Sequence, residues 1–350
     1  MDILKNSLNI NNVYLVTGCA GFIGFHLCNT LLNQGCQVIG LDNLNNYYAV
    51  DLKKYRLGHL TSNKIFTFIK ADIDNQAVLM GIFEQYRPDI VVNLAAQAGV
   101  RYSIENPDTY IQSNLIGFYN ILKACREFPV LHLIYASSSS VYGANTKIPF
   151  SVNDNVDQPL SLYAATKKTN ELLAHTYSYL YKIPCTGLRF FTVYGPMGRP
   201  DMAYFSFTKK IMNEEPIQVY NYGDCYRDFT YIDDIIEAMV RLLCNPPAKL
   251  IDKTSILNGM QYTVYNIGNS HPEHLLEFIT ALEKALSNAT HKEIRAKKEL
   301  VPMQPGDVKT TYSDSSSLEK DFGFKPNTPI EIGLQKFVNW YLEYYECSNY

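Results

Sequence analysis

Short apolar runs alternate with longer helix-compatible stretches through the first half of the chain. Each run has four or five residues and is rich in β-branched or aromatic side chains; the runs cover residues 13–16, 37–41, 65–69, 90–94 and 131–135, and a further strand is expected at 185–191. Strands that are buried on both faces have this composition, and stretches long enough for a helix connect parallel neighbours. The pattern therefore predicts an α/β fold with a parallel sheet and crossover helices.

The pattern changes beyond residue 191. Prolines interrupt the chain at 196, 200, 216, 246 and 247, and the remaining elements look mixed. We place a domain boundary near residue 192, with a first domain of residues 1–191 and a smaller mixed α/β substrate-binding domain of residues 192–350. One later strand, near 261–268, is expected to return to the main sheet. A chain of 350 residues is longer than a single hydrophobic core usually supports, which favours two domains.

A glycine-rich segment joins the first predicted strand to a helical stretch. Gly18, Gly21 and Gly24 recur at every third position, with Phe22 and Ile23 between the last two. Glycine lets the chain turn tightly and lets the backbone approach a diphosphate, while the start of the helix offers free N–H groups and a partial positive charge. A glycine turn without a ligand is the alternative. The place between strand and helix favours dinucleotide binding on a Rossmann-type, doubly wound sheet.

An acidic residue ends the second predicted strand. Asp42 lies 18 residues after Gly24, close to the spacing at which a carboxylate accepts a hydrogen bond from a ribose 2′-hydroxyl. The same carboxylate would repel a 2′-phosphate, and no arginine follows it directly. The segment therefore predicts NAD, and not NADP, as the cofactor.

A tyrosine and a lysine are spaced to share one face of a helix. Tyr163 and Lys167 are four residues apart, and Ser161 is a candidate N-cap. A phenol with an ordinary pKa of about 10 acts as a base near neutrality only if that pKa is lowered, at a cost of about 4 kcal/mol. A nearby ammonium and a positively charged nicotinamide favour the phenolate. An ordinary exposed pair is the alternative interpretation of the spacing.

A run of serines follows the fifth predicted strand, within residues 136–143. Open α/β sheets bind ligands at the carboxyl ends of their strands, where a serine hydroxyl can hydrogen-bond a substrate oxygen as its charge changes. A polar loop is the alternative, and it loses weight beside the glycine segment and the Tyr163/Lys167 pair.

The composition narrows the classes of partner. The formal net charge is −3 and 19% of the residues are charged, so no global positive field favours nucleic acid or anionic lipid. The eight cysteines include no Cys-x-x-Cys pair, and we expect no metal site. No apolar run approaches the ~18–20 residues that span a bilayer, and the first residues lack the apolar core of a signal peptide. We expect no membrane partner, reduced thiols and a cytoplasmic location.

Together these motifs resemble those of the extended short-chain dehydrogenases/reductases, and specifically the nucleotide-sugar 4-epimerases that act on UDP-glucuronate. The matching segments run over nearly the whole chain: 17–24, 42–45, 94–101, 137–143, Tyr163 with Lys167, 188–203, 227–234 and 304–308. The form Gly-Arg-Pro-Asp-Met at 198–202 is closer to the uronic-acid epimerases than to the UDP-galactose enzymes. The resemblance implies an isomerase that converts UDP-glucuronate to UDP-galacturonate for surface polysaccharide.

The resemblance also implies a reaction in which NAD stays bound. Tyr163 takes the proton from the sugar 4-hydroxyl while carbon 4 gives up a hydride, and a transient 4-keto sugar turns over and is reduced on its other face. Lys167 holds the ribose and lowers the phenol pKa, and Ser138 is the third catalytic hydroxyl, with Ser140 as its near alternative. The implied cofactor contacts are Gly18, Gly21, Phe22, Ile23, Gly24, Asp42, Asn43, Asp72, Ile73, Leu94, Ala95, Ala96, Tyr163 and Lys167.

Substrate contacts follow from the same resemblance. Arg227 would pair with the UDP phosphates, although an ion pair with Asp228 or Asp234 is the structural alternative, and Asp307 would accept from the uridine ribose. Gln304 stands where relatives often carry arginine. The full set implied is Arg101, Ser138, Ser139, Ser140, Thr192, Arg199, Tyr220, Arg227, Gln304 and Asp307.

Arg199 has a chemical reason to contact the substrate. Oxidation of carbon 4 of glucuronate makes a β-keto acid, which loses carbon dioxide when the carboxylate bond aligns with the carbonyl π system. Our hypothesis is that Arg199, with Thr192 and a serine of the run, holds the carboxylate out of that alignment. An exposed loop charge is the alternative for Arg199.

Several alternatives stay open. The same scaffold also suits an epimerase of UDP-glucose/UDP-galactose or of UDP-N-acetylhexosamines, or a UDP-glucuronate decarboxylase, and a non-catalytic NAD-binding protein is the choice from another class. The family pairs the Tyr163 helix and its neighbour around 114–124 in a four-helix bundle, which implies a homodimer. We interpret residues 271–274, with Pro272, as a capped helix start and not as a metal site.

Overall fold

One seven-stranded parallel sheet forms the centre of the computed structural model, which describes residues 7–247, 261–303 and 308–347. The strands lie in the order β10-β6-β5-β4-β1-β2-β3, and every pair is parallel. Their bounds are β1 Val13–Thr17, β2 Gln37–Asp42, β3 Phe66–Lys70, β4 Ile90–Asn93, β5 His132–Ser138, β6 Cys185–Phe190 and β10 Tyr262–Ile267. The predicted parallel α/β fold is confirmed. β10 lies at the edge of this sheet, beside β6.

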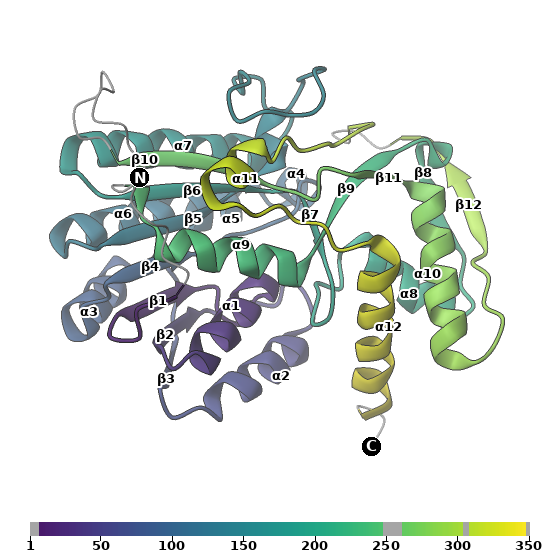
Figure 1. Cartoon of the computed structure of the whole chain (residues 1–350), viewed down its shortest axis with the longest axis horizontal. Coiled ribbons are helices and arrows are strands. Elements are labelled where there is room, and N and C mark those ends of the chain that lie inside the picture. Colours follow the sequence, from purple (N-terminus) through teal and green to yellow (C-terminus); the bar gives the residue numbers. More distant parts are fainter. Residues whose placement is uncertain (1–6, 248–260, 304–307, 348–350) are drawn as a thin grey trace.

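Two cores cover the two faces of this sheet. In β1, Val16 packs into one core and Leu15 into the other, because successive side chains of a strand point to opposite faces. Helices α1 (Phe22–Asn33), α2 (Val50–Thr61) and α9 (Ile232–Cys244) cover the first face, and α3 (Gln76–Tyr86), α6 (Phe118–Glu127) and α7 (Leu162–Tyr181) cover the second (Figure 1). Burial on both faces explains why the strands are continuous apolar runs.

Two small sheets form the other side of the molecule (Figure 1). One joins β7 (Thr192–Tyr194), β9 (Tyr226–Tyr231) and β11 (Pro272–His274), and the other joins β8 (Ile217–Tyr220) and β12 (Lys298–Val301). Helices α8 (Ala203–Met212), α10 (Leu275–Thr290) and α12 (Ile330–Cys347) complete this part of the molecule, whereas α11 (Ser316–Phe322) lies against β10 of the main sheet (Figure 1). The domain boundary near residue 192 stays a prediction.

The interpretation of residues 271–274 as a helix start was wrong. Pro272 to His274 form β11, antiparallel to β9, and α10 begins only at Leu275. The buried carboxylate of Asp228 accepts hydrogen bonds from the backbone N–H groups of Asn269 and Ser270, and these bonds draw the segment onto β9.

The chain between β4 and α6 contains three short helical pieces: α4 (Tyr102–Glu105), α5 (Pro107–Tyr110) and the π-helix η1 (Ile111–Gly117).

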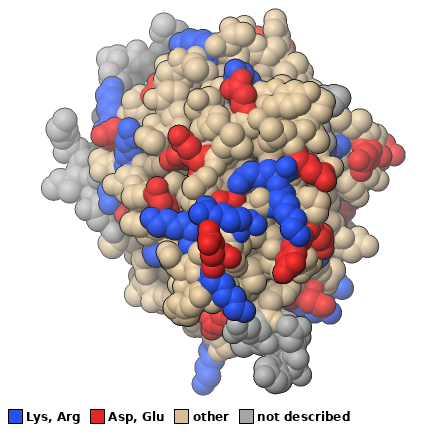
Figure 2. Space-filling view, turned by 90° about the vertical axis from the view of Figure 1, so that its right-hand side faces the viewer, with Lys and Arg blue, Asp and Glu red and all other residues tan. Residues whose placement is uncertain are grey.

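Within the described residues, no helix combines the length and apolar character needed to cross a bilayer. On the face formed by α8, α10 and β12, basic and acidic side chains are interspersed (Figure 2). Glu283 of α10, for example, forms ion pairs with Arg295 and Lys298.

Candidate active site

A large cavity of about 940 Å³ lies at the carboxyl edge of the main sheet, facing the two small sheets. It opens at the switch point between β1 and β4, where the strand order reverses and doubly wound sheets bind dinucleotides. Every cofactor, catalytic and substrate residue expected from the sequence lines this cavity, apart from Gln304 and Asp307, which lie outside the described residues.

The glycine segment after β1 forms a tight cradle. Gly18 has φ +71°, and a Cβ there would lie 2.8 Å from the backbone nitrogen of Ala95, so the loop after β1 touches the loop after β4. A Cβ on Gly24 would collide with the carbonyl oxygen of Gly18. Helix α1 starts at Phe22 without a side-chain cap, so its first N–H groups face the cavity unsatisfied by a capping side chain. These features fit the diphosphate of a dinucleotide.

Asp42 lies at the end of β2 beside this cradle. Its carboxylate is buried and accepts backbone N–H groups of Ala20 (3.1 Å) and Leu44 (2.8 Å), and burial raises its pKa. Each oxygen has a second lone pair that can accept from a ligand hydroxyl. Asn43 donates to Asp72 (2.7 Å), which holds those two side chains together on the cavity wall. The arrangement fits an adenosine ribose at Asp42.

Helix α7 carries the tyrosine and the lysine. Ser161 caps the helix by accepting from the N–H of Ala164 (3.1 Å), as the sequence predicts. The ammonium of Lys167 donates to the carbonyl of Ala136 (2.8 Å) at the end of β5 and lies 5.9 Å from the centre of the Tyr163 ring. Burial lowers the pKa of Lys167 to about 8.

The pKa of Tyr163 differs from the sequence-based expectation. Burial raises it, and the hydrogen bond with Ser138 and the charge of Arg199 only partly oppose that effect. The ammonium of Lys167 donates to a backbone carbonyl and lies 5.9 Å from the centre of the phenol ring. Burial outweighs the groups that lower the pKa, so the protein alone favours the neutral phenol, and the positive charge of a nicotinamide would favour the phenolate.

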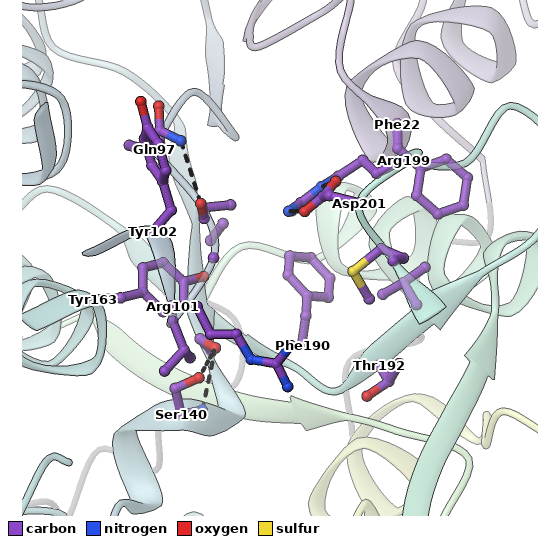
Figure 3. Close-up of a pocket in the computed structure, with 18 of the residues that line it drawn as sticks. Phe22, Gln97, Arg101, Tyr102, Ser140, Tyr163, Phe190, Thr192, Arg199 and Asp201 are labelled. Atoms are coloured by element: carbon purple, nitrogen blue, oxygen red, sulfur yellow. Dashed lines mark hydrogen bonds and ion pairs between the residues drawn. The ribbon is translucent and has the colours of Figure 1, made fainter. Parts of the chain in front are cut away.

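The two candidate serines have different surroundings. The hydroxyl of Ser138 donates to Ser140 Oγ (3.1 Å) and accepts the backbone N–H of Ser140 (3.2 Å) at the start of the short helix Ser139–Tyr142. Of the two serines, Ser138 is the one whose side chain lowers the pKa of Tyr163. Figure 3 shows Tyr163 and Ser140 on the same side of the pocket.

Arg199 lines the opposite side of the pocket (Figure 3). Its guanidinium forms a two-point ion pair with Asp201, with Nε–Oδ1 at 3.0 Å and Nη2–Oδ2 at 2.5 Å, and the hydroxyl of Tyr47 donates to the same carboxylate (3.2 Å). Arg199 is therefore a fixed group of the cavity wall and not an exposed loop charge. Arg101 is a second cation in the pocket, and its guanidinium lies 4.9 Å from the centre of the Tyr220 ring.

The alternative of an ion pair for Arg227 is wrong. Its guanidinium donates to the carbonyls of Tyr226 (2.9 Å) and Lys309 (3.0 Å), and none of the described carboxylates lies within ion-pair distance. Asp228 instead accepts from Ser313, and Asp234 accepts from backbone N–H groups at 327 and 328. Two carbonyls orient the positive charge of Arg227 at the cavity without neutralising it.

Sequence reasoning missed two supports of the site. Asp201 was only part of a motif, although an acidic residue two positions after Arg199 is a signal for such a pair. Asn114 gave no sequence signal: it lies buried in the π-helix, accepts from Gln97 N (2.8 Å), and donates to Gln97 O (3.0 Å) and Thr166 Oγ1 (3.1 Å). It joins the loop after β4 to α7 next to Lys167. Among the described residues, no three His, Cys, Asp or Glu side chains are grouped to hold a metal ion.

Known proteins resemble this chain over nearly its full length. A family model described as GDP-mannose 4,6 dehydratase matches residues 15–337. Protein CapI from Staphylococcus aureus is 56% identical over 337 residues, 95% of this chain and 99% of that protein. A probable UDP-glucuronate 4-epimerase from Rhizobium meliloti is 44% identical over 345 residues, 96% of this chain and 98% of that protein.

The solved structures agree with these relatives. UDP-glucuronic acid 4-epimerase from Bacillus cereus, in complex with UDP-glucuronic acid and NAD, matches with a TM-score of 0.83 and 35% identity, over 95% of this chain and 100% of that chain. Fold, cavity and relatives point the same way: the chain belongs to the extended short-chain dehydrogenase/reductase family, among the UDP-glucuronate 4-epimerases.

Proposed function

We propose that this chain is an isomerase that converts UDP-glucuronate to UDP-galacturonate with bound NAD. One observation carries the proposal: a single cavity joins a glycine cradle, a Tyr163–Ser138 pair and three arginines at positions 101, 199 and 227. The cradle suits a dinucleotide, the pair suits proton transfer at a hydroxyl, and the arginines suit an anionic nucleotide sugar. The B. cereus relative binds both UDP-glucuronic acid and NAD.

NAD supplies hydride chemistry at carbon 4 of the sugar when it is bound. The segment Gly18–Gly24 would hold the diphosphate, with Asp42 on the adenosine ribose and Asp72 and Ile73 beside the adenine. Leu94, Ala95 and Ala96 would form the wall after β4, and Lys167 would hold the second ribose. Each of these residues lines the cavity, which supports the assignment.

Tyr163 acts as the acid and base in this proposal. Its phenolate removes the proton from the 4-hydroxyl as carbon 4 is oxidised to a ketone, and the phenol returns that proton when the ketone is reduced on its opposite face. Ser138, and not Ser140, lowers the pKa of Tyr163, which favours Ser138 as the third catalytic hydroxyl. Lys167, anchored on the Ala136 carbonyl, places its positive charge beside the ring and the cofactor ribose.

Arg199 sets the choice of a uronic acid in this proposal. Its ion pair with Asp201 fixes the guanidinium plane, so the remaining donors meet a substrate carboxylate in one orientation. Held in that way, with Thr192 and a serine hydroxyl, the carboxylate of the 4-keto sugar stays out of line with the ketone and carbon dioxide is not lost. Arg227 binds the UDP phosphates, and Arg101 and Tyr220 complete the nucleotide-sugar wall.

We infer a homodimer and a cytoplasmic location. Leu172 and Leu180 of α7 are each 56% exposed, and Ile116 and Tyr119 of the neighbouring η1–α6 segment are 44% and 43% exposed, an apolar surface that a second copy would cover. Light scattering of the purified protein, with Leu172→Glu as the variant expected to be monomeric, tests the dimer. The seven cysteines from Cys19 to Cys244 are thiols and not disulfides, which supports a reducing compartment.

A panel of UDP-sugars tests the proposed reaction. Purified protein without added NAD is incubated with UDP-glucuronate, UDP-glucose or UDP-N-acetylglucosamine, and the products are separated by chromatography. The proposal predicts UDP-galacturonate from UDP-glucuronate, and slower or no conversion of the two neutral sugars. UDP-pentose as the main product would assign a decarboxylase. In a parallel reaction with added NAD, consumption of that NAD in proportion to product would overturn the epimerase mechanism.

A further inference from the structure

The loop of residues 195–201, which carries Arg199, is an irregular segment that needs support. Met197 has a φ of +60°, in the left-handed region that an L-residue with a side chain rarely adopts. The loop links β7 to α8, and its backbone carbonyls at 196, 197 and 198 point toward helices α1 and α2 of the cofactor side, where they accept hydrogen bonds. Its position in the cavity therefore depends on donors from a distant part of the chain.

Arg56 of α2 supplies most of those donors. Its Nε and Nη2 donate to the carbonyl of Met197 (3.0 and 2.6 Å), and Nη2 also donates to the carbonyl of Gly198 (2.9 Å). His26 of α1 adds one bond to the carbonyl of Pro196 (3.0 Å), and burial lowers the pKa of its imidazole to about 4, which keeps it neutral at physiological pH.

The other edge of the same guanidinium binds the cofactor side. Nη1 of Arg56 donates to the carbonyl of Ala20 (3.0 Å), inside the glycine segment, and to the hydroxyl of Tyr48 (2.7 Å). The backbone N–H of Ala20 in turn donates to Asp42. One planar group thus joins the cradle expected to hold the diphosphate to the loop that carries Arg199.

Burial of the charged Arg56 guanidinium costs free energy, which suggests that the residue has a role beyond packing. The Arg56 side chain is fully buried, and no described carboxylate lies within ion-pair distance of it, so backbone carbonyls, the Tyr48 hydroxyl and the Tyr48 ring solvate its charge. In α2, the buried positions are Leu52, Lys53, Arg56 and Leu60, a stripe in which a purely structural role would call for apolar side chains. A lysine could not reproduce these hydrogen bonds in two directions, because its ammonium is a single point charge and lacks the planar set of N–H donors of a guanidinium.

The geometry points to Arg56 as a positioning residue for substrate choice: it holds the loop of residues 195–201 against the glycine segment and so places Arg199 for the uronic-acid carboxylate. This inference rests on the proposed function, since it assigns the carboxylate to Arg199. Arg56 acts through the loop and touches neither reacting atom.

The test compares two ligands on the NAD-loaded protein. Arg56→Lys keeps the positive charge but loses the planar set of guanidinium N–H donors. Lys54→Gln, on the exposed side of the same helix, is the matched control. Calorimetry should show UDP-glucuronate binding weakened about tenfold in Arg56→Lys, with UDP, which has no carboxylate, bound within about twofold of wild type. The kinetic counterpart is a raised KM for UDP-glucuronate, with UDP-pentose among the products. Lys54→Gln should match wild type in both ligands.

A double variant separates positioning from general support of the fold. If Arg56 acts through Arg199, Arg56→Lys combined with Arg199→Ala binds UDP-glucuronate no more weakly than Arg199→Ala alone. If Arg56→Lys does not fold, Tyr48→Phe replaces it: this variant removes one acceptor of the same guanidinium, and it should weaken UDP-glucuronate about threefold while leaving UDP unchanged.

The inference is overturned if Arg56→Lys weakens the binding of UDP and of UDP-glucuronate equally. It is also overturned if the loss of UDP-glucuronate affinity in the double variant equals the product of the losses in the two single variants. Such a result leaves the proposed function intact if the wild-type protein still forms UDP-galacturonate. A wild-type protein that neither binds nor converts UDP-glucuronate refutes the proposed function itself.

Discussion

The cofactor side of the cavity is formed by helix α7 and by segments that directly follow strands of the main sheet, whereas the substrate side is formed by loops and short strands. Gly18 follows β1, Asp42 ends β2 and Leu94 follows β4, so the sheet itself fixes their positions. Arg199 depends instead on contacts between residues far apart in sequence, such as Tyr47 with Asp201 and Arg56 with Met197, which are 154 and 141 positions apart. The main sheet thus positions the residues expected to bind the cofactor, whereas long-range contacts position Arg199, the residue expected to select the substrate.

This difference has a physical cause. Parallel strands bring their carboxyl ends to one edge whatever the loops contain, so residues just after strands gather without specific side-chain contacts. A loop has no such frame and is held only where donors reach its carbonyls. We therefore expect changes on the cofactor side to abolish turnover, and changes on the substrate side to alter substrate and product.

The replacement of Tyr163 by phenylalanine tests the cofactor side most severely. Without the hydroxyl the proposed general base is lost, so kcat for UDP-glucuronate should fall about 10³-fold, while UDP-glucuronate still binds. Tyr179→Phe on the exposed part of the same helix is the matched control and should keep wild-type kcat. Turnover within tenfold of wild type in Tyr163→Phe would remove Tyr163 from the proposed role.

A methyl group on the glycine cradle tests whether its shape is required. The Cβ of Gly24→Ala would collide with the Gly18 carbonyl, so the segment must shift and NAD should bind about a hundredfold more weakly. In Gly81→Ala, within α3, the added Cβ meets no atom within 4 Å beyond the backbone of its own helix and its chain neighbours, and the variant should gain up to ~1 kcal/mol of stability. NAD titrations and urea unfolding measure the two effects. Unchanged NAD affinity in Gly24→Ala would contradict the assignment of the cradle.

Loss of the Arg199 side chain tests the substrate side. Arg199→Ala should raise KM for UDP-glucuronate about tenfold to a hundredfold and release some UDP-pentose, because the carboxylate of the 4-keto sugar is no longer held. Arg295→Ala, whose side chain is 69% exposed, serves as the control for loss of a cation. Wild-type kinetics in Arg199→Ala, together with product chromatography that shows no UDP-pentose, would exclude Arg199 from this role.

The buried ammonium of Lys167 predicts a smaller effect, on stability. The unfolded lysine keeps its proton up to its ordinary pKa of 10.5, whereas the folded lysine loses it near 8. Between these values the unfolded state binds more protons, so the free energy of unfolding contributed by Lys167 rises with pH. Denaturant unfolding without UDP-sugar measures the free energy of unfolding of wild type and of Lys167→Met. The difference, wild type minus variant, should increase by about 1–2 kcal/mol between pH 8 and pH 9.5. A constant difference across this range would show that the lysine pKa is not lowered.

Sequence reasoning reached much of this because the main signals are local. The apolar runs, the glycine spacing and the Tyr163/Lys167 spacing each need only a few neighbouring residues, and the strands lie where the runs are. The missing parts are interactions between distant residues: Lys167 bonding to Ala136 and Arg56 holding the 195–201 loop. The direction of the Tyr163 pKa was missed for the same reason, since burial comes from packing and not from spacing.

The central claim is that carbon 4 of the sugar loses and regains one hydride inside a single cavity. Carbon-4-deuterated UDP-glucuronate, incubated with the purified protein and no added NAD, tests it most directly. The account predicts UDP-galacturonate that keeps its deuterium at carbon 4, as read by mass spectrometry. Product in which solvent hydrogen has replaced the deuterium would contradict it.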